Sequence, residues 1–273
     1  MRLAERVERA ILAGDPTTLA GRARLKAAIL ARRLLVRLGD PTVRYRVGAA
    51  ELELPLSHEL PFYQHDHQRY DRQLGAIAAE LGGPVVDVGA NVGDSAAAIR
   101  AESDVPILCV EGDPAFFALL ERNARTIGGV ELERAFVEGP VRGRIQSGVG
   151  TAHVVEGDEP LASKPLAQIL DEHPAFARPA LIKLDTDGMD VPILLANLPL
   201  LEGFRPVLFF EYDPHLGAAP EIFDRLYEVG YATADWYENT GEHVATVELP
   251  AHLHEEYVGH GGARYADVCV RPR

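Results

Sequence analysis

The stretch PVVDVGANVGDS, residues 84 to 95, joins an apolar run to two glycines, an asparagine and an Ala-rich segment. The apolar run predicts a buried strand and the Ala-rich segment predicts a helix, so the glycines stand at a strand-to-helix turn. The turn reads G-x-N-x-G, whereas a dinucleotide fingerprint reads G-x-G-x-x-G. Asp87, just before the turn, would repel a pyrophosphate but suit an ammonium or, through water, an amino-acid head group. The stretch therefore predicts a nucleotide site that is not built for a dinucleotide.

The same design recurs three times further along the chain: an apolar run, an acidic residue near its end, then Gly or Pro. The four segments are VVDVG at 85–89, ILCVEGDP at 107–114, LIKLDTDG at 181–188 and VLFFEYDP at 207–214. Continuous apolar runs separated by helical patterns predict parallel strands joined by right-handed crossovers. Ligands of such sheets bind beyond the carboxyl ends of the strands. We therefore expect one rim of the sheet to carry Asp87, Glu111, Asp185 and Glu211.

Spacing and alternation of apolar residues predict the remaining elements. They are two helices within 1–38, a strand pair within 42–54, a helix at 66–81, a strand at 130–137, a hairpin at 143–156, a helix at 163–172 and three strands after 230. Antiparallel strands at the end of a parallel sheet fit this order. The predicted fold class is α/β, a doubly wound, mostly parallel sheet with an antiparallel C-terminal strand. Residues 61–273 form this domain, and residues 1–60 form a helical extension with a strand pair.

The composition restricts the partners of the chain. Its 273 residues hold 27 Lys and Arg against 41 Asp and Glu, a formal net charge of −14. A nucleic acid would meet mostly repulsion, so a small molecule or glycan is the expected substrate. The Arg-rich second helix, Arg22 to Arg37, could hold an acidic partner or a phosphate, although charge runs usually form solvated faces.

The cysteines and the apolar segments give no sign of a disulfide or of membrane insertion. Cys109 and Cys269 each lie inside an apolar run, which predicts buried thiols that act as small hydrophobes. The N-terminal residues lack the continuous apolar region of a signal peptide, and no apolar run is long enough to span a bilayer. The sequence therefore predicts a soluble, cytoplasmic protein.

DVGANVGDS, VEGDP, LIKLDTDGMD and LFFEYDP follow one another along the predicted strands. This series resembles the FkbM-type S-adenosylmethionine-dependent methyltransferases, whose third motif usually reads K-[IV]-D-[VI]-E-G-[YF]-E. The resemblance covers residues 85–214, extends loosely to the C-terminal strands and leaves residues 1–60 outside. It implies a Rossmann-like class I methyltransferase fold with S-adenosyl-L-methionine as cofactor. Asp187 and Asp190 stand where the family has Glu, so the substrate pocket is expected to differ from that of better-known members.

The resemblance also implies which residues hold the cofactor. Those expected at its methionine part are Asp87, Gly89, Asn91 and Gly93; Glu111 is expected at the ribose, Asp113 or Phe116 near the adenine, and Ala90, Asp94 and Gly112 complete the set. An acid at the end of the second strand also fits a nucleotide site on general grounds, because it accepts hydrogen bonds from both ribose hydroxyls. Tyr63 and Gln64, within LPFYQHDHQRYD at 60–71, are expected to fold over the cofactor and to bind its carboxylate.

Methyl transfer needs an aligned nucleophile and a group that removes its proton. Asp185 is the candidate base or orienting group, since perturbed carboxylates gather at strand-end clefts. The expected supporting residues are Lys183, Asp187 and Glu211. The alternative interpretation is that Asp185 only orders the loop after its strand.

Other functions stay open at this stage. The rim carboxylates, with Asp213 and His215, could collect a divalent cation, but their spacing matches no metal motif, and we predict no metal site. The leading hypothesis is an O-methyltransferase acting on a hydroxyl of a sugar, glycan or secondary metabolite. The alternatives are an NAD-dependent oxidoreductase or epimerase, and a non-catalytic cofactor-binding scaffold that docks through its Arg-rich N-terminal helices. The oligomeric state is open, a homo-oligomer included.

Overall fold

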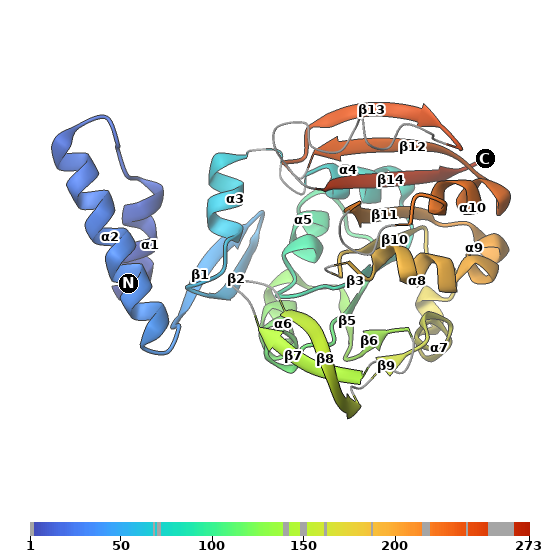
Figure 1. Ribbon diagram of the computed structural model, residues 1–273, viewed down its shortest axis with the longest axis horizontal. Helices are drawn as coiled ribbons and strands as arrows, with labels where there is room; N and C mark the ends of the chain where they lie inside the picture. The colour runs from blue at the N-terminus through green and yellow to red at the C-terminus, as the bar shows by residue number, and fades with distance from the viewer. Residues whose placement is uncertain are drawn as a thin grey trace.

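The computed structural model describes residues 3–67, 69, 72–138, 142–147, 152–160, 163–186, 188–214, 219–238, 240–250 and 265–273. Its centre is an eight-stranded sheet in the order β13-β12-β14-β11-β10-β3-β4-β5 (Figure 1). The strands are β3 (Val85–Val88), β4 (Ile107–Val110), β5 (Val130–Glu133), β10 (Leu181–Leu184), β11 (Val207–Tyr212), β12 (Tyr231–Glu238), β13 (His243–Glu248) and β14 (Ala266–Pro272).

The five strands from β5 to β11 are parallel, and β14 runs antiparallel between β11 and β12. The chain first builds outward from β3 through β4 to β5, then returns to β10 on the other side of β3 and continues to β11. This reversal is the switch point of a doubly wound, Rossmann-like sheet. The predicted fold class, with its antiparallel C-terminal strand, is confirmed.

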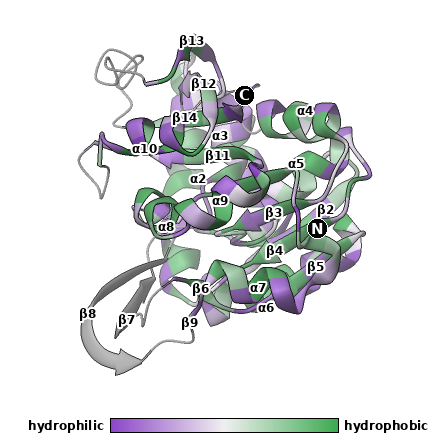
Figure 2. Ribbon diagram, turned by 90° about the vertical axis from the view of Figure 1, so that its right-hand side faces the viewer, coloured by the Kyte–Doolittle hydropathy of each residue, from purple (hydrophilic) through white to green (hydrophobic). Residues whose placement is uncertain are grey.

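Helices cover both faces of the sheet, and each face has its own apolar core (Figure 2). One core packs α7 (Leu166–Glu172), α8 (Asp190–Ala196), α9 (Leu198–Phe204) and α10 (Ile222–Glu228) against the sheet; the other packs α4 (Arg72–Leu81), α5 (Asp94–Glu102) and α6 (Pro114–Ile127). Alternate strand residues face opposite cores, so Val86 and Val88 join the first and Val85 joins the second. Burial on both faces explains why these strands are continuous apolar runs.

The predicted N-terminal elements are present. They are α1 (Leu3–Leu12), α2 (Leu19–Arg37), β1 (Thr42–Val47) and β2 (Ala50–Pro55), followed by α3 (Leu60–Asp66). The β1–β2 hairpin packs on α5 and α6, and its inward residues share the core that contains Val85. Asn123 of α6 fastens it by accepting from the Glu53 amide at 2.7 Å and donating to the Glu53 carbonyl at 3.1 Å. Figure 1 shows α1 and α2 set apart from the sheet, at the opposite end of the molecule from β12 and β14.

Three sequence-based element predictions need correction. The helix expected at 66–81 is α4, which begins only at Arg72; a separate helix that was not predicted, α3, ends at Asp66, where His67 takes an extended conformation. The strand expected at 130–137 is broken, since the chain leaves the sheet after Glu133 and β6 (Phe136–Val137) pairs with β9 (Ser163–Lys164). The helix expected from 163 therefore begins only at Leu166, after Pro165, whose ring disfavours helical backbone in the residue before it.

The predicted polar hairpin is present as β7 (Arg142–Ser147) and β8 (Ala152–Pro160), which pair antiparallel. The predicted buried thiols are confirmed, since Cys109 and Cys269 are both buried and free. The histidine-rich segment that follows β13 lies outside the described residues. Among the described helices, none combines the length and apolar character needed to cross a bilayer.

Candidate functional site

The strand-to-helix turn after β3 lies at the switch point, against the end of β10. Gly89 has a φ of +76°, and a Cβ on it would overlap the carbonyl oxygen of Asp185. The amides of Gly89 and Ala90 both donate to the Val110 carbonyl of β4, at 3.0 and 3.1 Å. The turn is thus fixed between both neighbouring strands, and only a glycine fits its first position. Gly93, at a φ of +90°, precedes the first residue of α5, Asp94.

Asp87 and Lys183 face each other across β3 and β10, below this turn. Lys183 Nζ lies 3.1 Å from Asp87 Oδ1 and 3.3 Å from Asp185 Oδ2, and it donates to the Gly89 carbonyl at 3.3 Å. Asp87 is fully buried, and no hydrogen-bond donor among the described residues reaches its Oδ2 atom. Burial raises the pKa of Asp87 although the ammonium opposes this. Burial alone would lower the pKa of Lys183, but the carboxylates of Asp87 and Asp185 hold it well above its usual value.

Glu111, at the end of β4, joins the turn after β3 to the loop before α6. Its Oε2 accepts from the Asn91 amide at 2.8 Å, and its Oε1 accepts from the Asp113 amide at 2.6 Å. Asn91 has a φ of +48°, a left-handed conformation that Asn tolerates better than most residues. Burial raises the pKa of Glu111 to about 7 against the lowering effect of these two amides. Glu111 therefore organises two loops of the site, a role that its position in the sequence did not reveal.

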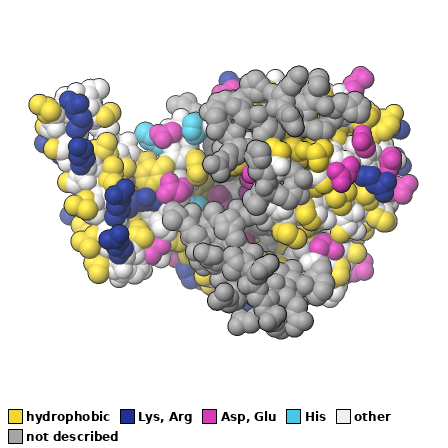
Figure 3. All heavy atoms as spheres, in the orientation of Figure 1, with side chains coloured by type: hydrophobic (Ala, Val, Ile, Leu, Met, Phe, Trp, Pro, Cys, Tyr) yellow, Lys and Arg dark blue, Asp and Glu magenta, His cyan; other side chains and the backbone are white. Residues whose placement is uncertain are grey.

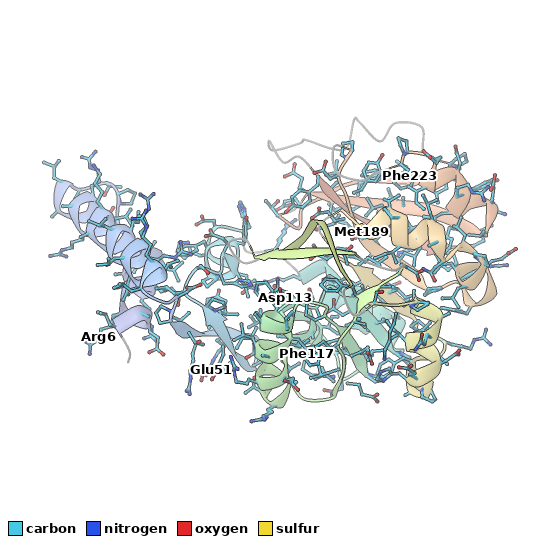
Figure 4. The ribbon with its side chains drawn as sticks, turned by 60° about the horizontal axis from the view of Figure 1, so that its bottom comes forward. Arg6, Glu51, Asp113, Phe117, Met189 and Phe223 are labelled. Carbon is cyan, nitrogen blue, oxygen red and sulfur yellow. The ribbon has the colours of Figure 1, made fainter. Side chains whose placement is uncertain are left out.

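Asp113 and Phe116, expected near the adenine, lie at the start of α6. Figure 4 labels Asp113 at this position. The Asp113 carboxylate caps this helix: its Oδ1 accepts from the amides of Ala115 and Phe116 at 2.7 and 2.9 Å. Gly112 lies against the ring of Phe136, which would be 2.5 Å from a Cβ at that position. The Phe136 ring thus packs against this loop. The sequence prediction missed this contact, because Phe136 belongs to β6, outside the main sheet.

The loop after β10 carries Asp185 and is organised by Asp190. The Asp190 Oδ2 accepts from the Thr186 amide at 3.1 Å and from the Thr186 hydroxyl at 2.8 Å, and its Oδ1 accepts from the Glu211 amide at 3.4 Å. Burial raises the pKa of Asp190 to about 6, and the charge of Asp185 adds to this. The side chain of Asp185 is 53% exposed, so it is open to a ligand on the rim side. Asp187 lies outside the described residues.

Asp267 is a further acidic residue of this region that the sequence prediction missed. It lies near the start of β14, opposite Glu211 of β11. Burial raises the pKa of Asp267 to about 8, with Asp185 and Asp190 adding to the rise and Lys183 opposing it. An antiparallel strand brings its amino end to the rim where parallel strands end, so a carboxylate at its beginning joins the site. Only the strand direction could have revealed this residue.

The pH dependence of stability is expected to show the proton on Asp267. Its folded pKa of about 8 exceeds the ordinary value of about 3.9, so the folded state holds this proton more tightly. Stability from this proton is complete below the unfolded pKa, falls progressively as pH rises from about 4 toward 8, and is lost above the folded pKa of about 8. In Asp267→Asn we expect a shallower fall of the unfolding free energy between about pH 4 and pH 8, with at most about 1.4 kcal/mol per pH unit removed. Urea unfolding at a series of pH values measures this, and Asp104→Asn, an exposed site, is the control. Equal slopes for wild type and Asp267→Asn would contradict a protonated Asp267 carboxyl in the folded state.

The remaining predicted residues are placed as follows. Glu211 is the half-buried residue of β11, between the buried Phe210 and Tyr212, and Asp213 follows that strand. Tyr63 and Gln64 lie on α3, beside α1, with the Tyr63 side chain 44% exposed. Within the described ranges, no group of three or more His, Cys, Asp or Glu side chains is arranged to hold a metal ion. His215 lies outside those ranges.

The electrostatic character of the rim follows from these contacts. Among the described residues of this region, five carboxylates interact with one buried ammonium: Asp87, Asp94, Glu111, Asp185 and Asp267 with Lys183. Desolvation and mutual repulsion raise the pKa values of Asp87, Glu111, Asp190 and Asp267. A cation or a donor of hydrogen bonds would relieve both, whereas a phosphate would add to the repulsion. The fold and the site therefore define a Rossmann-like protein with an acidic, cation-favouring rim at its switch point.

Comparison of the sequence with protein-family models finds no match, and comparison with curated protein sequences finds none. Solved structures with a similar fold do exist. A putative O-methyltransferase from Klebsiella pneumoniae is 15% identical, with a TM-score of 0.44 over 74% of this chain and 80% of that one. A putative RNA methyltransferase from Pyrococcus horikoshii is 14% identical, with a TM-score of 0.41 over 89% and 98%. A tRNA (uracil-54, C5)-methyltransferase from Pyrococcus abyssi, in complex with S-adenosyl-L-homocysteine, is 13% identical, with a TM-score of 0.44 over 84% and 44%. The assignment of the fold rests on the strand order itself.

Proposed function

We propose that the protein is an S-adenosylmethionine-dependent methyltransferase that transfers a methyl group to a hydroxyl of a sugar, glycan or secondary metabolite. The observation that carries the proposal is Asp87, a fully buried carboxylate at the switch point whose Oδ2 has no donor among the described residues. An unpaired buried oxygen of this kind is costly unless a ligand completes it. The ammonium of an amino-acid-bearing nucleoside supplies such a donor, directly or through water.

The charge balance of the rim supports the same class of cofactor. S-adenosylmethionine brings a sulfonium and an ammonium against one carboxylate, so its net charge is opposite to that of the rim. The pyrophosphate of NAD would bring two negative charges close to Asp87 and Glu111, which disfavours the oxidoreductase alternative. Glu111, already ordered by the amides of Asn91 and Asp113, has free lone pairs on both oxygens to accept from ribose hydroxyls.

The acceptor side of the proposal rests on Asp185. The bound sulfonium supplies the electrophilic methyl group, so the residues of the chain must orient a hydroxyl and remove its proton. Asp185 is the exposed carboxylate at the end of β10, and Lys183 holds it at 3.3 Å. In this proposal Lys183 is a positioning residue, because it is buried beneath the rim, and Asp190 fixes the loop that carries Asp185. Asp187, Glu211, Tyr63 and Gln64 stay proposed members of the same site.

The experiment compares two ligands by calorimetry: S-adenosylhomocysteine, and 5′-methylthioadenosine, which lacks the amino-acid part. We expect wild type to bind both. In Asp87→Asn the affinity for S-adenosylhomocysteine should fall about tenfold to a hundredfold, the usual loss for a hydrogen bond to a charged group, while methylthioadenosine binding stays within about twofold. Glu111→Gln should weaken both ligands alike, because both carry the ribose.

The control variant is Asp104→Asn, which removes the same charge from an exposed loop position. It should bind like wild type, and thermal unfolding should show that every variant is folded. Absence of heat with either ligand, together with micromolar binding of NADH, would reject the proposal. Transfer of a labelled methyl group to saccharide hydroxyls, tested against amine acceptors, then distinguishes O-methylation from the other acceptor classes.

A further inference from the structure

Helix α2 exposes an apolar ridge that is unusual for a surface helix. Its exposed members are Leu19, Leu30 and Leu34 of α2 and Leu38, the residue that follows the helix, with 81, 68, 57 and 74% of each residue accessible. At about 100° per residue these leucines fall within roughly one quadrant of the helix, and Ala23 and Ala27 lie between them. Of the nineteen residues of α2, Ala28 is the buried one. Single exposed leucines need no explanation, but a continuous ridge of them marks a contact surface.

A row of cations runs beside this ridge. Its members, the basic row, are Arg22, Lys26, Arg33 and Arg37, all exposed, and Arg24 lies on the other side of the ridge. Figure 3 shows several dark blue Lys and Arg side chains on the N-terminal helices, with yellow hydrophobic side chains next to them. None of the five forms an ion pair with a described residue, and Leu19–Arg37 contains no acidic residue although the whole chain carries −14. The cations therefore face outward with no partner on the described part of the chain.

Arg32 shows by contrast what a structural arginine of α2 does. It donates to the carbonyls of Leu56 and Ser57 at 3.0 and 2.9 Å, pairs with Glu59 at 3.2 Å, and stacks over the Phe62 ring at 4.7 Å. This residue anchors α2 on its inner side. The ridge and the basic row are on the outer side of α2. They can therefore contact a partner while Arg32 keeps the helix attached to the rest of the protein.

The occupant of this face must be anionic and must also accept apolar side chains. A second copy of α2 does not fit, because helix-to-helix pairing would bring two basic rows together. If α2 docked on the acidic sheet domain of another copy, the contact would be head-to-tail. Each copy would then bind the next, and the assembly would grow into an open-ended chain of molecules. A flat anionic surface contacts the ridge and the cations on both of its sides at once, whereas a protein would need an apolar groove with acidic walls on both sides.

We propose that α2 binds to an anionic lipid surface, with the leucine ridge among the headgroups and the basic row against the lipid phosphates. Amphipathic helices with this pattern lie in the membrane interface plane, and clusters of four to eight Lys and Arg favour anionic lipids. The position of α2 at the far end of the molecule keeps the acidic body away from that surface (Figure 1). Repulsion of the body is screened within about 8 Å at physiological salt.

The test is co-sedimentation of the full chain with lipid vesicles. Wild type should bind vesicles of phosphatidylglycerol mixed with phosphatidylcholine, bind phosphatidylcholine vesicles at least about tenfold less, and dissociate as salt rises. Leu30→Gln/Leu34→Gln should lose binding without losing stability, since both side chains are exposed. Arg33→Gln/Arg37→Gln should weaken it about tenfold or more. The matched control is Arg125→Gln/Arg178→Gln, which removes two exposed charges elsewhere and should bind like wild type.

Three outcomes would overturn the proposal. The first is no binding to the mixed vesicles at low salt by the folded protein. The second is equal weakening by the control pair, which would mean that net charge alone acts. The third is a dimer in light scattering that dissociates in Leu30→Gln/Leu34→Gln while vesicle binding is absent, which would assign the ridge to a second copy. None of these results depends on methyl transfer.

Discussion

Lys183→Met is expected to lower the free energy of unfolding by about 3 to 5 kcal/mol, the usual loss when a buried charge is left without its partner. Asp87 is fully buried, and Lys183 Nζ lies 3.1 Å from its Oδ1. Methionine has nearly the length of lysine and fills the same apolar space, so the loss measures charge more than cavity. Urea unfolding at neutral pH, extrapolated to water, gives the value.

The matched variant is Asp87→Asn/Lys183→Met, which removes both charges. It should recover most of the loss, and the coupling in the double-mutant cycle isolates the pair. Because Asp87 in Lys183→Met lacks the ammonium that lowers its pKa, its folded pKa rises further and the variant should lose stability as pH rises through neutrality. A loss below about 1 kcal/mol would contradict the buried pair, since that is the range of an exposed one.

Gly89→Ala is expected to have the second large effect, with a loss of more than about 4 kcal/mol or no recovery of folded protein. The added Cβ would overlap the Asp185 carbonyl oxygen and would lie 2.8 Å from the Asp185 carbonyl carbon. Backbone on both sides is held by the pairing of β3 with β10, so neither strand can move away without breaking hydrogen bonds of the sheet. The left-handed φ of +76° adds strain for any residue with a Cβ.

Gly82→Ala is the control that separates overlap from strain. Gly82 also has a left-handed φ, +63°, but a Cβ there would meet no atom within 4 Å. It should cost only about 1 to 2 kcal/mol. Comparison of soluble yield and urea unfolding for the two variants measures the difference. Equal losses would show that strain alone acts and that the turn after β3 is not pressed against β10.

Local sequence patterns were enough for much of the sheet. Continuous apolar runs placed β3, β4, β10 and β11, because a strand buried on both faces leaves that pattern whatever its neighbours are. The acids after these runs were expected on one rim, since parallel strands end together. Alternation placed β1 and β2 in the same way. The pattern was less informative where a segment leaves the sheet, as at Phe136, because a strand paired outside the main sheet looks the same in sequence.

The contacts of the site needed the assembled sheet. Nothing in LIKLDTDG says that Lys183 faces Asp87, because that register comes from the packing of two strands nearly a hundred residues apart. Asp267 joins the rim only because β14 runs antiparallel, and Glu111 binds the turn after β3 only because β4 lies next to β3. A sequence pattern indicates which faces of a helix or strand are buried, but it does not indicate which residues those faces contact. Strand order and register are set by long-range packing, and they determine which carboxylate meets the ammonium and which is left for a ligand.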